Sequence, residues 1–564
     1  MLEPIFSPLK YYLRTAKDAH SQNVRDYLSL LSNKANVDRE ANAKTVAKLD
    51  AKEAQLNTLQ QNASGKKSLR TLIVALAIIA DFIFSLYCFS SDMSEVGKAL
   101  SLLGGLALCI FIIVFTCKKL NARLRALNEQ IAQKQAEADV LRREAWAQVA
   151  PLNVLFKEDD SLNLFTKTLP FITFDKCFTD TRLLELMGYG FSGSIDGEEC
   201  ILDTLSGELY GSPFVYVQKR SHRLGTKTYR GSLTISWTTT SKDSKGNTVT
   251  HHHSQTLHAS ITRPAPFYHT DTALYFGNQA VPNVNFSRTY AHVEDKSESA
   301  IDRKVRKGEK KIQRLEEKAL REGDDFQGVA NAEFDVLFGA TNRTNDLEFL
   351  QMFTPRAQES MLELLLYKEG YGDDFSFAKY GTLCAIRSEH SQGVPLYPTA
   401  NAYYSHNVTE AESSFIWHNE NFFRSVYFDF APLLLIPVYQ QPLIRSEPIQ
   451  EGGLTAYNYE AIAYRLGSIL QPNGIGTPVI FKTALQDSRD DERAVQVCAY
   501  AYQTVERIHY ESMYGGDGYW HNVPVHWTEY IPVRQDSVIK IVKGDGGNSP
   551  SGGTTYRGYY AYKA

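Results

Sequence analysis

Two long apolar runs stand out from the polar positions around them in the first quarter of the chain. TLIVALAIIADFIFSLYCFS covers residues 71–90, and ALSLLGGLALCIFIIVFTC covers residues 99–117. Each run is long enough to cross a hydrocarbon core of about 30 Å as a helix. We therefore predict transmembrane helices over 70–90 and 99–117, joined into a tight hairpin by a loop over 91–98.

The charges beside these runs predict an orientation. The flanks are basic and the loop is mainly acidic: Lys66, Lys67 and Arg70 precede the first run, Lys118, Lys119, Arg123 and Arg125 follow the second, and Asp92, Glu95 and Lys98 lie between them. By the positive-inside bias, both flanks lie in the cytoplasm. The N-terminus has no apolar run of signal-peptide length, so no cleaved leader is expected. We expect a multi-pass protein of the plasma (inner) membrane with both termini in the cytoplasm, and the same flanks argue against two buried core helices.

One acidic residue, Asp81, interrupts the first run. An ionised carboxylate at this depth costs about 2.5–3.5 kcal/mol, so the side chain should face protein or water. Two interpretations stay open: a proton- or ion-sensitive site, or a protonated side chain that hydrogen-bonds to Ser101 or to another subunit. The small residues Ser101, Gly104 and Gly105 permit close helix packing, which also favours oligomers.

Apolar residues recur at coiled-coil spacing over 118–150, after the second run. The seam is formed by Leu120, Leu124, Leu127, Ile131, Ala138 and Leu141, with Lys134 interrupting it. The N-terminal arm, over 1–69, has a weaker stripe with polar interruptions at Asn42 and Lys52. Because the hairpin brings the arms side by side, we expect them to pair as an antiparallel coiled-coil stalk. Pairing between subunits is the alternative.

The remainder of the chain predicts a large, β-rich mixed domain. We expect a β-rich cytoplasmic domain over 151–296, an α/β region with a charged helix over 297–445, and a β-containing region over 446–543. The residues 544–564 are predicted to form a flexible Gly/Ser/Tyr tail. The fold class is therefore a membrane-anchored α+β protein.

Four segments give specific expectations. KDSKGN (242–247) predicts the tight turn of a β-hairpin. Residues 297–322 predict a solvated, salt-bridged amphipathic helix, because acidic and basic residues alternate along it. Residues 334–367 read as a strand, a polar connection, a helix, and then a further helix that starts at the pair Thr354 and Pro355. Residues 422–442 are strongly apolar but contain two prolines, so we predict a buried strand.

The stretch FDVLFGATNRTNDLEFLQMFTPRAQESMLELL (334–365) adds a resemblance. Together with the two apolar runs and the coiled flanks, it resembles a family of uncharacterised bacterial two-span membrane proteins. In that family a similar F-x-V segment leads through an acidic turn to a Thr-Pro helix start. The resemblance implies a cytoplasmic mixed α/β domain, and it implies no activity because the family has none established.

Composition and motifs point away from catalysis and nucleic acid. The net charge is -4, which gives no reason to expect a nucleic-acid partner, and the seven cysteines are scattered, which favours reduced thiols. No nucleotide-binding, metalloprotease or hydrolase motif is found. The adjacent acids Asp373 and Asp374 read as a polar loop. We therefore predict a protein that is not an enzyme and that has no cofactor and no metal site.

The histidine-rich stretch TVTHHHSQTLHA (248–259) is read as a strand. Side chains alternate along a strand, so His251 and His253 share one face while His252 and His258 share the other. A pair two residues apart can chelate a transition metal but needs a third ligand. His222, His269 and His292 can approach only through the fold, and we expect that none of them does.

These features favour a membrane-anchored, non-enzymatic scaffold or tether. We expect it to sit in the lipid bilayer, to form homo-oligomers and to present its cytoplasmic domain to a protein partner. One alternative is a transport or sensing component in which Asp81 titrates. A second alternative is a cryptic hydrolase whose site is assembled from distant residues of the cytoplasmic domain.

Overall fold

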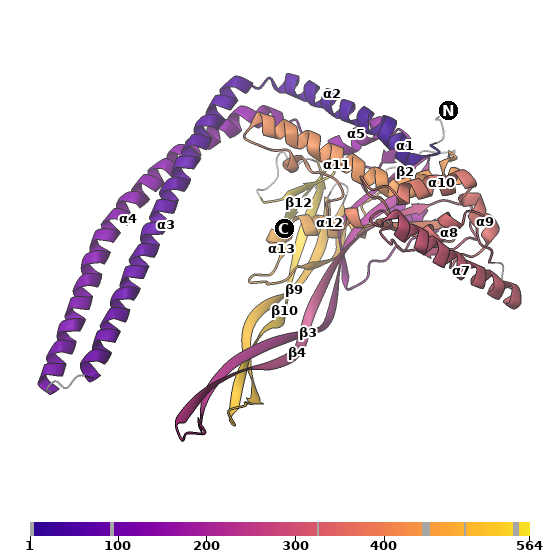
Figure 1. Ribbon diagram of the computed structural model, residues 1–564. Coiled ribbons are helices and arrows are strands. Elements are labelled where there is room, and N and C mark those ends of the chain that lie inside the picture. The colour runs from indigo at the N-terminus through magenta and orange to yellow at the C-terminus, as the bar shows by residue number, and fades with distance from the viewer. Residues whose placement is uncertain (1–4, 91–94, 324–325, 443–451, 490–491, 545–551) are drawn as a thin grey trace. The chain divides into compact units, whose positions relative to one another are not determined.

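The computed structural model describes residues 5–90, 95–323, 326–442, 452–489, 492–544 and 552–564 (Figure 1). The chain forms two compact units: one comprises Met1–Asn23, Glu158–Pro398 and Asn419–Ala564, and the other comprises Val24–Lys157 and Thr399–His418. The first unit contains two antiparallel sheets with helices, and the second is a long helical hairpin. The α+β class predicted from the sequence is thus observed.

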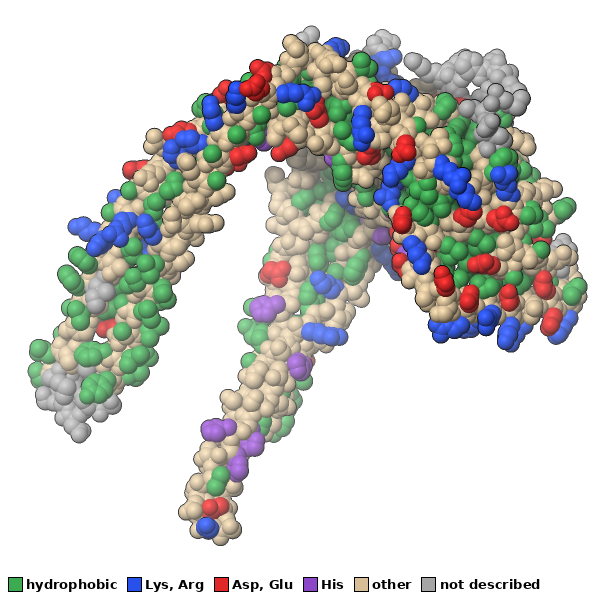
Figure 2. Space-filling model, turned by 45° about the horizontal axis from the view of Figure 1, so that its top comes forward, with side chains coloured by type: hydrophobic (Ala, Val, Ile, Leu, Met, Phe, Trp, Pro, Cys, Tyr) green, Lys and Arg blue, Asp and Glu red, His purple; other side chains and the backbone are tan. Residues whose placement is uncertain are grey.

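The helical unit is dominated by α3 (Arg39–Ser90) and α4 (Glu95–Asn153), which run antiparallel (Figure 1). Each predicted apolar run continues into its polar arm as one unbroken helix. Both helices are long and apolar enough to cross a membrane, and 0% and 6% of their most apolar windows are buried. Figure 2 shows hydrophobic side chains covering this end of the hairpin. Residues 91–94 of the predicted loop lie outside the described residues.

The predicted seam is the packed face of the α4 arm. Its six apolar residues are buried or half-buried: Leu120, Leu124, Leu127, Ile131, Ala138 and Leu141. The residues between them are mostly exposed. Ala138 packs against Leu49 and Leu56 of α3. The two arms therefore pack against each other within one chain, as the hairpin geometry led us to expect.

The polar side chains that interrupt the apolar stripes of the two arms bind polar partners on the opposite helix or nearby on their own helix. The Asn42 amide donates a hydrogen bond to Gln148 Oε1 at 3.2 Å. Glu137 pairs with Lys52 of α3 at 2.5 Å and with Lys134 at 3.0 Å. Lys134 interrupts the seam because it joins this charged cluster. Exposed pairs of this kind add little stability, but they match the two arms in register.

One sheet of the α+β unit has seven antiparallel strands in the order β1-β2-β3-β4-β7-β6-β5. Their bounds are β1 Ile172–Phe174, β2 Glu199–Leu209, β3 Ser212–Lys242, β4 Thr248–Gly277, β5 Phe286–Arg288, β6 Phe375–Tyr380 and β7 Leu383–Ser388. The helices with residues in its core or beside it are α1 Pro8–Tyr11, α5 Asp160–Thr168, α7 Glu298–Glu322, α8 Ala332–Phe338, α9 Asp346–Met352, α10 Pro355–Leu365 and the later part of α11 Val408–Leu434. An aromatic-rich core lies between these helices and the sheet.

The second sheet has five antiparallel strands in the order β11-β12-β10-β9-β8. Their bounds are β8 Ile480–Arg489, β9 Glu492–Tyr514, β10 Trp520–Lys543, β11 Thr554–Tyr556 and β12 Tyr559–Lys563. A separate core joins this sheet to α6 Asp180–Gly188, α12 Ala456–Arg465 and α13 Gly467–Leu470. The remaining helical segments are α2 Lys17–Ala35, a π-helical turn Tyr12–Ala16 and short 3-10 turns at Glu389–Ser391, Ala400–Ala402 and Pro437–Gln440.

Two long hairpins, β3–β4 and β9–β10, extend from the sheets as one arm (Figure 1). Ile235 and Leu257 of the first hairpin pack against Val523 of the second. A Cβ at Gly231 would lie 2.0 Å from the carbonyl oxygen of Pro524, so this close approach requires glycine. The predicted turn at 242–247 is present, with Gly246 at a φ of +85°. Each hairpin thus has an apolar face that is buried only because the other hairpin packs against it.

The apolar segment 422–442 is helical, and the strand predicted there was wrong. It belongs to α11, which contains Pro432, and to the 3-10 turn that Pro437 begins. Apolar residues at nearly every position hid the helical period, since α11 is buried on most sides here. Pro432 lies in the last turn, where its missing N–H removes one intrahelical hydrogen bond and α11 ends two residues later.

The strand predicted at the start of 334–367 was also wrong. Residues 332–338 form α8, because the Asn331 side chain accepts a hydrogen bond from the Phe334 N–H at 3.1 Å and Gly339 ends the helix at a φ of +77°. The Thr354 cap at the start of α10 and the charged helix α7 are present as predicted.

Both ends of the chain differ from the predicted boundaries. Residues 1–23 belong to the α+β unit, where Tyr12 is buried and Tyr427 donates a hydrogen bond to the Pro8 carbonyl at 2.7 Å. The predicted tail is ordered over 552–564, where β12 pairs with β10 and the side chain of Tyr556 is fully buried. Alternating aromatic residues there fill the core of the second sheet.

Candidate functional site

The apolar hairpin contains a groove that brings the predicted intramembrane residues together. It encloses about 490 Å³. Small and apolar residues line it with one carboxylate: Ala77, Ala80, Asp81, Phe84, Ser101, Gly104, Gly105, Leu108 and Cys109. Asp81 and Ser101 therefore face one groove from opposite helices. The Cys109 thiol donates a hydrogen bond to the Ala77 carbonyl at 3.5 Å, which joins the same two helices.

The two glycines of this groove have different surroundings. A Cβ at Gly105 would lie 2.8 Å from the Phe84 ring and 3.3 Å from Asp81 Oδ1. A Cβ at Gly104 would meet no described atom within 4 Å. Close approach of α3 and α4 thus needs glycine at 105, whereas Gly104 faces open space. The close helix approach that we expected small residues to permit is found at Gly105.

The histidine-rich strand lies near the tip of the β3–β4 hairpin and is exposed. The His253 ring lies 2.8 Å from Thr239 Oγ1, and the His251 ring lies 2.9 Å from Ser241 Oγ. The centroids of the two rings are 6.5 Å apart. Each imidazole is therefore paired with a hydroxyl of the neighbouring strand.

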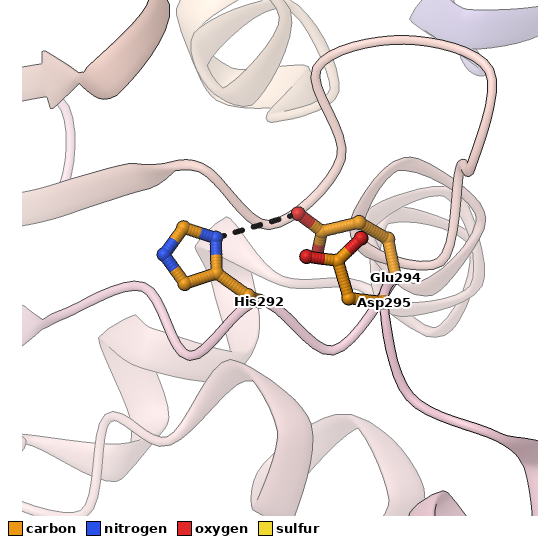
Figure 3. Close-up of side chains that lie close together, drawn as sticks. All are labelled: His292, Glu294 and Asp295. Carbon is orange, nitrogen blue, oxygen red and sulfur yellow. Dashed lines mark ion pairs between the residues drawn. The ribbon is translucent and has the colours of Figure 1, made fainter.

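His292 lies together with two acids that the sequence did not single out, in the loop between β5 and α7 (Figure 3). Ligand atoms of His292, Glu294 and Asp295 all lie within 4.8 Å of one another. His292 Nδ1 is 3.6 Å from Glu294 Oε1, and its Nε2 is 3.4 Å from Glu389 Oε2. Imidazole with carboxylates is a donor set that suits Zn²⁺ or Mn²⁺. The cluster is the one group of this kind in the described part of the chain.

A buried acid shapes the loop that carries His292. Asp373 Oδ2 accepts hydrogen bonds from the N–H groups of Ala291 at 2.9 Å and Val293 at 3.3 Å. Its other oxygen pairs with the Arg288 guanidinium, and the two side chains are 0% and 1% exposed. Backbone bonds on both sides hold His292 at a φ of +47°, a region that few residues with a Cβ occupy.

The neighbouring acid, Asp374, points to a second buried network. His390 Nδ1 lies 2.5 Å from Asp374 Oδ2, and its Nε2 lies 3.5 Å from Asp429 Oδ1. The imidazole stacks on Tyr371 at 3.8 Å. Burial disfavours the imidazolium, but the charges of Asp429 and Asp374 outweigh burial and raise the pKa of His390. This network ties α11 to the β6–β7 hairpin through an imidazole held between two acidic side chains.

A small cavity lies beside Asp429, lined also by Tyr216, Thr272 and Ser425. Its volume is about 20 Å³, which is room for a single water molecule. The cavity is too small for a substrate.

The sequence contains a signal that Asp373 and Asp374 lie at the end of a β-hairpin. Asp373 and Asp374 read as a polar loop, yet both are largely buried and paired. FSFAKY and LCAIRS alternate around a tight turn, and their pairing places Phe375 opposite Ser388. The same register puts Asp374 opposite Glu389, and the Glu389 N–H donates to the Asp374 carbonyl at 2.9 Å. If the β6–β7 pairing is extended by one residue pair, Asp374 lies opposite Glu389, the residue just before His390. The sequence therefore indicated that these acids lie near His390.

Comparison of the chain with protein-family models, with curated proteins and with solved structures finds no match. The resemblance of residues 334–365 to the family of uncharacterised two-span membrane proteins therefore stays a prediction.

Proposed function

We propose that the protein is a membrane-anchored tether without enzymatic activity. In this proposal the hairpin over 70–117 spans a bilayer, and the α+β unit is presented to a protein partner in the cytoplasm. The observation that carries the proposal is the exposure of the apolar hairpin. Its large side chains are open to the surroundings, among them Leu76 (55% exposed), Phe82 (64%), Leu103 (68%) and Phe111 (66%).

A bilayer is the environment that these helices fit. Burying one large aliphatic or aromatic side chain is worth about 1.5–3 kcal/mol, so many such residues left in water are strongly unfavourable. A helix satisfies its own backbone hydrogen bonds in hydrocarbon. At about 1.5 Å per residue, the run over 71–90 reaches about 30 Å, which matches the hydrocarbon thickness. The basic flanks support a cytoplasmic location for both arms.

Self-association is the second part of the proposal. The arms of α3 and α4 pack against each other within one chain, so their seam is already occupied. Gly104, which faces open space on the hairpin, is a surface where a second copy can approach closely. Mass photometry of the full-length protein in detergent tests this part. We expect a defined oligomer, and a clean monomer would contradict it.

A transport or sensing role is a second candidate that one observation favours. Asp81 lines a groove together with Ser101, and its side chain is half-buried there. Intramembrane carboxylates in such places are often functional. Asp81→Asn separates the two candidates: a lost pH or ion response with an unchanged oligomer favours the sensor. Unchanged responses with unchanged assembly favour the tether.

A further inference from the structure

A groove of about 630 Å³ lies between α7 and α8 in the α+β unit. Five basic residues line it together with small and apolar ones: Lys304, Lys307, Gly308, Lys310, Lys311, Ile312, Arg314, Val336, Gly339 and Thr341. Among the described residues, none that lines the groove is acidic. Figure 2 shows Lys and Arg side chains gathered along the lower right edge of this unit, the edge along which α7 runs in Figure 1.

Three acidic residues of α7 bind partners outside the lining of this groove. Glu317 and Glu322 pair with Arg321 and Lys318 near the end of the helix, at 3.9 and 3.6 Å. Glu316 accepts a hydrogen bond from the Gly328 N–H at 2.7 Å. Within the described ranges, none of the five lining cations has an ion-pair partner. The salt-bridged helix predicted from the sequence is therefore found in the last turns of α7, and the middle turns present unpaired charge.

The floor of the groove is rigid and apolar. Ile312 is buried, and a Cβ at Gly308 would lie 2.4 Å from Val336 Cγ1, so α7 and α8 pack closely beneath the charged rim. The volume falls in the range of small-molecule sites. It is much larger than a single phosphate ion needs. A charged rim over an apolar floor suits a ligand that has both anionic groups and an uncharged body.

Two further cations, Lys296 and Arg288, lie near Lys304 of the rim. Burial lowers the pKa of Lys304, and the nearby charge of Lys296 lowers it further. The buried guanidinium of Arg288 acts on Lys304 in the same direction, opposed by Asp373. Two nitrogens of Arg288, Nε and Nη1, have no hydrogen-bond partner in the described part of the chain. An anion in the groove would relieve the repulsion among these cations.

We propose that this groove binds a small anion that carries at least two phosphate groups. The ligand is either a free polyphosphate compound or a phosphorylated lipid headgroup. Lysine ammonium and arginine guanidinium groups bind phosphate oxygens, and four lysines with one arginine exceed what one phosphate group can engage. The proposal rests on the geometry of α7 and α8 and is independent of the proposed membrane anchor.

The test is a binding titration of the full-length protein in detergent. Two probes distinguish the sources: inorganic tripolyphosphate for a free ligand, and short-chain phosphatidylinositol bisphosphate for a lipid headgroup. The test variant is Lys307→Gln/Lys311→Gln, which removes two exposed cations of the groove. The matched control is Lys318→Gln/Arg321→Gln, which removes the same charge from the paired end of the same helix.

We expect the native protein to bind at least one probe and the groove variant to bind it more weakly by about tenfold for each lysine removed, because a charged hydrogen bond contributes about that much. The control should lose less than about threefold. Binding of tripolyphosphate identifies a free ligand, and binding of the lipid alone identifies a headgroup. Absence of binding to both probes, or equal losses in the two variants, would overturn the proposal. Unchanged urea midpoints verify that both variants fold.

Discussion

Replacing Asp373 with alanine should destabilise the α+β unit by about 3–5 kcal/mol, the usual cost of breaking a buried ion pair from one side. The structure supports the upper part of this range. Arg288 is 1% exposed and would keep its charge without a carboxylate partner. The N–H of buried Val293 would also lose its acceptor, which costs about 1–3 kcal/mol for a group shielded from water. Asp373→Asn keeps one acceptor oxygen, so about half of the loss is expected.

Urea unfolding of the full-length protein in detergent measures this effect. Hydrogen exchange of peptides that cover β5 and β6 separates the α+β unit from the helical hairpin. For an m-value of about 3 kcal/mol/M, the midpoint should fall by at least about 1 M. Asp295→Ala is the matched control, because Asp295 lies in the same loop and is exposed. Its effect should stay within about 0.5 kcal/mol. Equal midpoints for the two alanine variants would refute the reasoning.

Two further predictions concern buried charge and helix packing. The pKa of His390 is raised by the carboxylates that face it, so its stabilisation is complete below the ordinary histidine pKa of about 6.5 and is lost as pH rises through the higher folded-state value. His390→Gln should therefore lower the free energy of unfolding and flatten its pH dependence above about pH 6.5; an unchanged slope in urea titrations at several pH values would count against this. Gly105→Leu should separate α3 from α4, since its Cβ has no room beside Phe84, whereas Gly104→Leu should leave the hairpin intact. Cysteine cross-linking between the helices in detergent measures this, and equal yields for both variants would contradict it.

The hairpin and its seam were predictable because their signals are local and periodic. The apolar runs, the turn at 242–247 and the spacing from Leu120 to Leu141 each depend on residues close in sequence. The predicted helices and the packed face of α4 follow directly from them. Even the interruption at Lys134 has a local partner in Glu137, three residues away.

The wrong predictions come from segments whose environment is set by distant residues. The strand predicted over 422–442 failed because a helix that is buried on most sides has no polar face to reveal its period. The tail was predicted to be flexible from its composition, but Tyr556 fills a core contributed by the second sheet. Asp373 and Asp374 looked like loop residues because their partners, Arg288 and His390, come from elsewhere in the chain.

The central claim is that the hairpin over 70–117 crosses a bilayer with both arms in the cytoplasm. Labelling of single introduced cysteines with a membrane-impermeant maleimide tests it most directly. We expect Lys98→Cys to react in intact cells, and Lys66→Cys and Lys119→Cys to react only after permeabilisation. The account would be contradicted if Lys98→Cys, like Lys66→Cys and Lys119→Cys, reacted only after permeabilisation.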